Sequence, residues 1–189
     1  MLPNDRTFNG KLFVEIDGKI YYRCYALKEK GKYRITIEVK SINSPYSQAI
    51  AFKFSIDPKF EGKLVINNQT FDVLNTKSQN FAIPVDVCER KKLSMELRID
   101  DGFFLLSSAS DYLKDYYEKI KEVYKQNGIS KEIKESYTSG FTATSLYGNA
   151  FWLEELSENH YLVHCNDHIM DEDFDDMVFD LRIEKLNST

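Results

Sequence analysis

The chain has 189 residues, of which 42% are hydrophobic and 29% are charged, so a largely disordered chain and a collagen-like fibre are excluded. Aromatic residues make up 14% of the sequence, against only 8 Gly and 4 Pro, and this composition favours β structure. The net charge is −5 and no concentrated basic face is evident, which argues against nucleic-acid binding.

The first hundred residues are predicted to form short antiparallel strands. Asp17 and Gly18 are the strongest hairpin signal among them, because both residues tolerate the positive φ of a type I′ turn. They separate two predicted strands at residues 11–16 and 19–27. Further strands are predicted at residues 33–39, 49–56, 63–66, 70–74, 81–87, 93–99 and 103–107. Strands at this spacing suggest a β-sandwich or a barrel.

One amphipathic helix is predicted after these strands, from about residue 109 to residue 126. Its apolar residues recur at helical spacing, at Leu113, Tyr117, Ile120 and Tyr124. Asn127 and Gly128 then supply a left-handed end to the helix. We expect the tyrosine side of this helix to pack on a sheet rather than to bind a cofactor.

The rest of the chain is predicted to return to β structure, with strands at residues 151–155, 160–165 and 176–184 and a hairpin loop at residues 156–159. In the last strand one face is apolar and is expected to lie in the core, with Met177, Phe179, Leu181 and Ile183. The predicted fold class is therefore mainly β, an antiparallel β-sandwich-like arrangement with one amphipathic α-helix.

The chain is expected to have an N-terminal β-sandwich-like region at 1–107, a helix and linker at 108–136 and an acidic C-terminal β unit at 137–189, or to be one domain overall. Its charge is unevenly distributed. Residues 1–134 hold 23 Lys and Arg against 18 Asp and Glu, whereas residues 135–189 hold 2 against 12. Surfaces that only need solubility normally mix both signs, so the acidic region indicates a cation or a basic partner.

The sharpest acidic pattern lies just before the last predicted strand. Asp171, Asp173 and Asp175 alternate there and Asp176 follows, a spacing that can turn several oxygens toward one Ca²⁺ ion. An EF-hand is excluded, because Asp176 and Arg182 stand where that loop needs Gly and Glu. The alternative is a solvated acidic turn whose Asp side chains cap backbone amides.

Two segments carry a family resemblance, FWLEEL at residues 151–156 and DEDFDDMVF at residues 171–179. They resemble the paired motifs of the DUF4114-like β domains found in exported bacterial proteins, over roughly the last forty residues. The resemblance implies a calcium-associated β-sandwich module rather than an enzyme. Carried over residue by residue, it implies that Ca²⁺ is bound by Glu154, Glu155, Asp171, Asp173, Asp175 and Asp176.

All three histidines of the chain, His160, His164 and His168, lie within nine residues. On a strand His160 and His164 would share a face, with Cys165 on the other. A Zn²⁺ or other transition-metal site could use His164, His168 and Asp167. The other interpretation is an exposed strand with scattered polar residues.

Aromatic residues near these segments suggest a second kind of ligand. Trp152 and Tyr147 could stack on a sugar ring, although aromatic residues on strands are more often part of the core. The expected partner is therefore a protein or a carbohydrate. Nucleophilic catalysis has little support, since the sequence contains no G-x-S-x-G motif.

The function favoured by these patterns is a non-catalytic binding or interaction module, with an acidic loop stabilised by Ca²⁺. The alternatives are an inhibitor or immunity-type protein that covers a basic partner, and a metal-dependent hydrolase that uses His160–His168. No apolar run approaches the ~20 residues of a membrane span, and three widely spaced cysteines suit a reducing compartment. The expected location is the cytoplasm, or outside the cell if a leader has been removed.

Overall fold

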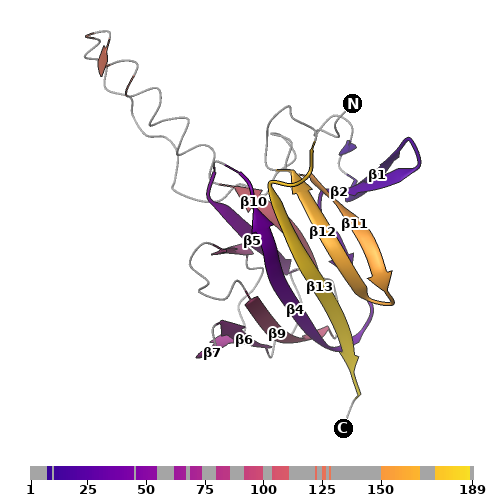
Figure 1. Cartoon of the computed structure of the whole chain (residues 1–189). Coiled ribbons are helices and arrows are strands. Elements are labelled where there is room, and N and C mark those ends of the chain that lie inside the picture. Colours follow the sequence, from indigo (N-terminus) through magenta and orange to yellow (C-terminus); the bar gives the residue numbers. More distant parts are fainter. Residues whose placement is uncertain are drawn as a thin grey trace.

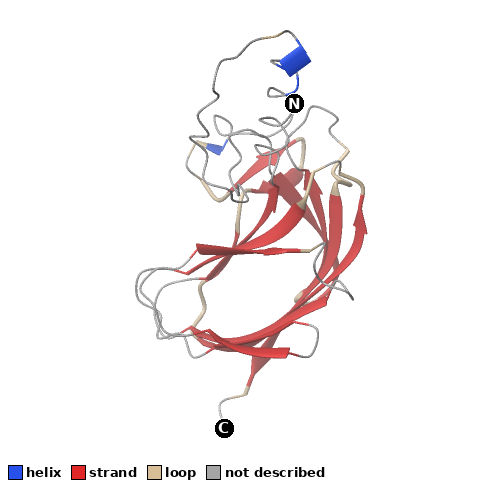
Figure 2. Cartoon of the chain, turned by 90° about the vertical axis from the view of Figure 1, so that its left-hand side faces the viewer, coloured by secondary structure: helices blue, strands red, loops and turns tan. Residues whose placement is uncertain are grey.

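The computed structural model describes most of the strand-forming part of the chain. The described residues are 8–9, 11–44, 46–54, 62–66, 69–73, 80–85, 92–99, 104–110, 122, 125–126, 128, 150–166 and 173–187. These residues are built almost entirely from strands (Figure 2), and each pair of neighbouring strands is antiparallel. The prediction of a mainly β, antiparallel fold is confirmed. No helix in this part of the chain is long and apolar enough to cross a membrane.

The strands form one large and one small sheet (Figure 1). The large sheet has nine strands in the order β1 (Phe13–Ile16), β2 (Lys19–Tyr22), β11 (Ala150–Ser157), β12 (His160–Asn166), β13 (Met177–Leu186), β4 (Gly31–Ile42), β9 (Lys92–Ile99), β6 (Gly62–Ile66) and β7 (Gln69–Val73). The small sheet has four strands in the order β3 (Tyr25–Leu27), β10 (Phe104–Ser110), β5 (Gln48–Phe54) and β8 (Asn80–Pro84).

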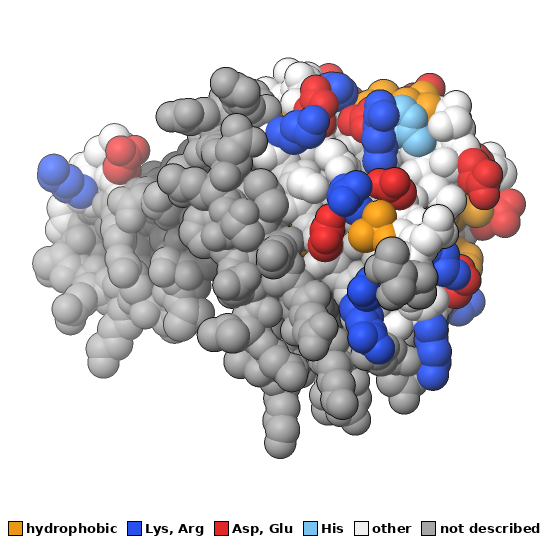
Figure 3. Space-filling view, turned by 90° about the horizontal axis from the view of Figure 1, so that it is seen from below, with side chains coloured by type: hydrophobic (Ala, Val, Ile, Leu, Met, Phe, Trp, Pro, Cys, Tyr) orange, Lys and Arg blue, Asp and Glu red, His pale blue; other side chains and the backbone are white. Residues whose placement is uncertain are grey.

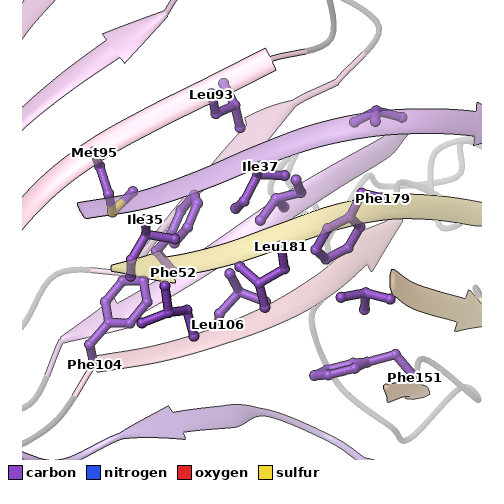
Figure 4. Packing of buried hydrophobic residues seen from close by; sticks show 14 of the residues in the cluster. Ile35, Ile37, Phe52, Leu93, Met95, Phe104, Leu106, Phe151, Phe179 and Leu181 are labelled. Atoms are coloured by element: carbon purple, nitrogen blue, oxygen red, sulfur yellow. The ribbon is translucent and has the colours of Figure 1, made fainter. Parts of the chain in front are cut away.

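One hydrophobic core joins the two sheets. Alternate residues of the large sheet are buried, as the period of two in the sequence predicts. Their side chains meet those of the small sheet in a single cluster, which Figure 4 shows with Ile35, Ile37, Phe179 and Leu181 from the large sheet and Phe52, Phe104 and Leu106 from the small one. The two sheets therefore pack face to face as a sandwich.

The C-terminal strands lie in the middle of the large sheet. β13 pairs with β4 from Met177–Ile42 to Leu186–Lys32, and it pairs with β12 on its other side. The predicted inward face of β13 is confirmed, because Phe179 and its neighbours at alternate positions are buried. Strands of the predicted regions 1–107 and 137–189 thus share one sheet.

The boundary between the last N-terminal strand and the predicted helix is corrected by the structure. β10 continues to Ser110, which pairs with Gln48 of β5, so the helix cannot begin at residue 108 or 109. Pairing with β5 supplies the backbone hydrogen bonds of these residues, and it overrides the local preference of the sequence for a helix. Most of the remaining predicted helix lies outside the described residues. Gly128 has a φ of +66° and its N–H donates to the carbonyl of Lys125, as a helix end would require.

The predicted strand at residues 19–27 is divided between the two sheets. β2 belongs to the large sheet and β3 to the small one, so the chain crosses the sandwich between Tyr22 and Tyr25. The N–H groups of Arg23 and Cys24 both donate to the carbonyl of Leu12, at 2.8 and 3.3 Å. These bonds hold the crossing against the start of β1.

Candidate functional site

The β1–β2 hairpin leaves the neighbouring strand β11 after a short contact. Asp17 and Gly18 have φ angles of +53° and +78°, which confirms the predicted type I′ turn. β2 pairs with β11 only at Tyr22–Phe151 and Tyr21–Trp152. Toward its turn the hairpin diverges from β11 (Figure 1). From Ile20 and Leu153 onward the two strands are therefore not paired with each other within the described chain.

A pocket of about 460 Å³ is lined by residues of this hairpin and of β11, together with Tyr25 and Tyr161. Its wall combines three tyrosines, two aliphatic side chains and two charged ones, and these are Tyr22, Tyr25, Tyr161, Ile20, Leu153, Lys19 and Glu155. Gly18 and Trp152 complete the lining. Because β3 contributes Tyr25, the pocket is built by both sheets at the point where the chain crosses between them. We call it the tyrosine pocket.

The tyrosines of this pocket are part of a continuous aromatic cluster. Tyr22 stacks on Phe151 with ring centroids 5.6 Å apart, and Tyr25 lies 6.3 Å from Tyr22 and 6.1 Å from Tyr161. Burial raises the pKa of Tyr22, and burial together with Tyr161 raises that of Tyr25. Both phenols therefore stay neutral near pH 7, and they present an apolar ring with a polar tip.

Both faces of the Trp152 ring are covered. His164, directly opposite on β12, stacks on the ring with centroids 4.0 Å apart and an interplanar angle of 2°. Lys19, from β2 on the other side of β11, places its Nζ 3.4 Å from the ring centroid. A sugar could stack on Trp152 only after Lys19 or His164 had moved. Tyr147, the second predicted stacking residue, lies outside the described residues.

The two described histidines each pair with a different carboxylate on the outer face of the large sheet. His164 Nε2 lies 3.1 Å from Glu154 Oε2, and His160 Nε2 lies 2.7 Å from Asp180 Oδ2. The two histidines share a face, as predicted, while Cys165 is buried in the core. At about 3.3 Å per residue they are about 13 Å apart along β12, so they do not meet at one ion.

The remaining members of the predicted transition-metal site, His168 and Asp167, lie outside the described residues. Within the part of the chain that the structure describes, no group of three or more His, Cys, Asp or Glu side chains is arranged to hold a metal ion. The hydrolase alternative therefore gains no geometric support from the positions of His160 and His164.

The acidic loop before β13 is a hydrogen-bonded turn in its described part. The N–H of Asp175 donates to Asp173 Oδ1 at 3.3 Å, and Asn43 Nδ2 donates to Asp175 Oδ2 at 3.1 Å. The Asp176 carbonyl accepts the N–H groups of Asn43 at 3.0 Å and of Ser44 at 3.3 Å. The loop is thereby fastened to the end of β4. Asp171 lies outside the described residues.

The two glutamates of the predicted calcium site are not near this loop. Glu154 is level with Leu162 and Asp180 in the sheet, four residues from the level of Asp176, or about 13 Å along the strands. Glu155 points to the other face, where it lines the tyrosine pocket. The described members of the predicted set therefore do not gather around one ion, and calcium binding by this set remains a prediction.

The tyrosine pocket was not predicted from the sequence. The signal that could have found it is the pair Tyr22 and Tyr25, which places two aromatic residues on either side of a strand end. Tyr161 joins them only through the pairing of distant strands.

Comparisons with known proteins give no assignment. A scan against protein-family models matches none, and searches of curated proteins and of solved structures give no match.

Proposed function

We propose that this chain is a non-catalytic binding module that holds a segment of another protein in the tyrosine pocket. The observation that carries the proposal is the pocket itself, which lies open between the β1–β2 hairpin and β11. Its volume of about 460 Å³ falls within the usual range of ligand pockets, about 300–1,000 Å³. Its apolar walls carry a few polar groups that could fix an orientation.

Two exposed apolar side chains, Phe13 and Ile20, lie at the same pocket. The exposed large hydrophobic residues of the described chain are Phe13, Ile20 and Leu156, with 56%, 43% and 49% of their surfaces accessible. Ile20 lines the pocket and Phe13 lies 6.0 Å from the Tyr22 ring, whereas Leu156 lies further along β11 and outside the pocket lining. Apolar surface concentrated beside a pocket is typical of a protein interaction site.

A protein ligand suits these residues better than a carbohydrate. A sugar usually needs an open aromatic face, and both faces of Trp152 are covered by Lys19 and His164. The pocket offers tyrosine rings and the aliphatic side chains of Ile20 and Leu153, which fit an apolar side chain of a partner.

The pocket can be tested by selecting ligands and then changing its wall. Random peptides of about twelve residues on phage, and a glycan array, would be probed with the wild-type chain. We expect peptides rather than glycans to bind. Ile20→Gln should weaken peptide binding by about tenfold, since it removes apolar surface from the wall without touching the core.

Leu186→Gln is the matched control, because Leu186 is a partly buried aliphatic residue on β13, outside the pocket. It should bind the selected peptides like the wild type. Peptides that bind the wild type and Ile20→Gln equally well would place the binding site elsewhere and contradict the proposal. Failure to select any ligand from both collections would contradict it too.

A further inference from the structure

One edge of β11 is open beside the tyrosine pocket. On one side β12 pairs with β11 from Ala150 to Ser157, but on the other side β2 pairs only with Phe151 and Trp152. In the part of the chain that the structure describes, no strand pairs with residues 153–157 on that side. Their outward backbone N–H and C=O groups are therefore available to another strand.

The pocket lies where a strand added to this edge would place its side chains. Leu153 and Glu155 of β11 and Tyr161 of β12 face the pocket, and Ile20 closes it from the hairpin. Side chains of an added strand would alternate between the two faces of the sheet. Every second side chain would then point toward the tyrosine pocket.

The charge of this edge indicates the charge of the segment that could pair with it. Glu154, Glu155 and Glu158 are all exposed, and neither β11 nor β12 contains Lys or Arg. The nearby Lys19 lies over the Trp152 ring. A second copy of this chain would bring glutamates opposite glutamates across paired edges, which is unfavourable. A basic segment would complement them.

We infer that the partner segment is an extended, basic stretch of another protein, which adds as a strand to residues 153–157 of β11. An apolar side chain of this segment fills the tyrosine pocket, and Lys or Arg residues beside it face Glu155 and its neighbours. This inference rests on the proposed function and specifies its ligand. Backbone hydrogen bonds supply affinity in this mode of binding, and the pocket supplies specificity.

The sequences of the phage-selected peptides test the charge and the pattern. We expect Lys or Arg to be enriched beside one apolar position. Glu155→Gln should weaken their binding by about threefold and reduce its dependence on salt. Glu184→Gln on β13 makes the same change at an exposed carboxylate away from the pocket, and it should leave the affinity unchanged. Selected peptides without basic residues would overturn the inference.

Backbone methylation of the best peptide tests strand addition, and it leaves the protein unaltered. Each peptide N–H is methylated in turn. Only alternate N–H groups of a strand face its neighbour, so methylation should abolish binding at every second position and be tolerated between them. If peptide binding depends on Ile20 but the effect of methylation does not alternate along the peptide, strand addition is overturned and the proposed function still stands.

Two further outcomes are decisive. If no selected peptide depends on Ile20, the proposed function itself fails. If sedimentation shows a dimer that the peptide dissociates, the occupant of the edge is a second copy of the chain, and the inference of a basic partner is overturned.

Discussion

Asp180 lies on the outer face of the large sheet, yet only 9% of its surface is exposed. Burial alone would raise its pKa, but hydrogen bonds from His160 and Arg182 outweigh burial, and the pKa lies below its ordinary value of 3.8. A carboxylate with a lowered pKa stabilises the fold above its unfolded-state pKa, and this stability is lost as the pH falls through the folded-state pKa.

Asp180→Asn should therefore lower the free energy of unfolding by about 1 kcal/mol near pH 7. The difference from the wild type should shrink as the pH falls below the ordinary pKa of 3.8 and through the lower folded-state pKa, where Asp180 becomes protonated in the folded chain. Urea unfolding from about pH 7 to about pH 3 measures this difference. Glu158→Gln, at an exposed turn position, is the control and should follow the wild-type profile. A difference that stays constant with pH would contradict the role given to Asp180.

Asp173 distinguishes the acidic turn from a calcium site. Its Oδ1 accepts the N–H of Asp175, which is the capping role of an acidic turn. Asp173→Ala should cost about 1 kcal/mol, whereas Asp173→Asn, which keeps a side-chain oxygen, should cost little. The thermal midpoints of the wild type and the two variants should have the same order in EDTA and in millimolar Ca²⁺, with Asp173→Ala the lowest. A wild-type midpoint that rises in Ca²⁺ and no longer rises in Asp173→Asn would instead support the predicted calcium loop.

Among the elements, the β1–β2 hairpin depends most clearly on one residue. Gly18 has a φ of +78°, and a Cβ added there would meet no atom within 4 Å. Gly18→Ala should thus cost about 1 kcal/mol through backbone strain alone. Asp17→Gly should be neutral or slightly stabilising, because Asp17 also has a positive φ. Urea midpoints of the two variants test the turn. A Gly18→Ala variant as stable as the wild type would contradict the backbone argument.

The positions of strands could be predicted where apolar and polar residues alternate along the whole strand. Tyr33, Ile35, Ile37 and Val39 alternate with polar residues, and β4 buries each of them. The predicted strand boundaries were less accurate where pairing with distant strands decides where a strand begins or ends. Nothing local at Arg23 and Cys24 shows that the chain changes sheets there. The loop predicted at residues 156–159 is shorter in the structure, because β11 extends to Ser157 through a bulge.

The candidate site was less predictable than the fold. Lys19, Trp152 and His164 meet through the order of strands β2, β11 and β12, which are distant in sequence. Such pairing leaves no local signal. Glu154 and the acidic loop are close in sequence terms, but the register separates them. Spacing along a chain predicts neighbours within an element and does not predict them across a sheet.

At the scale of the whole molecule, folding brings some basic side chains of the N-terminal half next to acidic side chains of the C-terminal half. Arg34 of β4 lies 2.6 Å from Glu96 of β9 and 3.3 Å from Glu184 of β13, so a basic side chain of the N-terminal half meets an acidic one of the C-terminal half. Seen from below, the described surface mixes Lys and Arg with Asp and Glu (Figure 3). These pairs are exposed, so solvent and salt screen them and they contribute little to stability.

The central position of β13 predicts that the strands unfold as a unit. A chain that ends at residue 176 lacks the partner of both β4 and β12, and it loses four buried apolar side chains, Met177, Phe179, Leu181 and Ile183. We expect this chain to show no cooperative urea transition in near-ultraviolet circular dichroism. A chain that ends at residue 187 keeps β13 whole and should unfold like the full chain. A cooperative transition in the shorter chain would instead support a separate N-terminal domain.

The pairing of β4 with β13 also bears on how the protein is made. β4 ends at residue 42 and β13 begins at residue 177, so the ribosome adds roughly 135 residues between them. At about 5–20 residues per second this takes on the order of ten seconds. During that time the β4 edge that later pairs with β13 has no partner strand. The apolar side chains of β4 are also not yet covered by those of β13. Other nascent chains can reach the same edge in that interval, so the protein is most exposed to misassembly before its last strand has been synthesised.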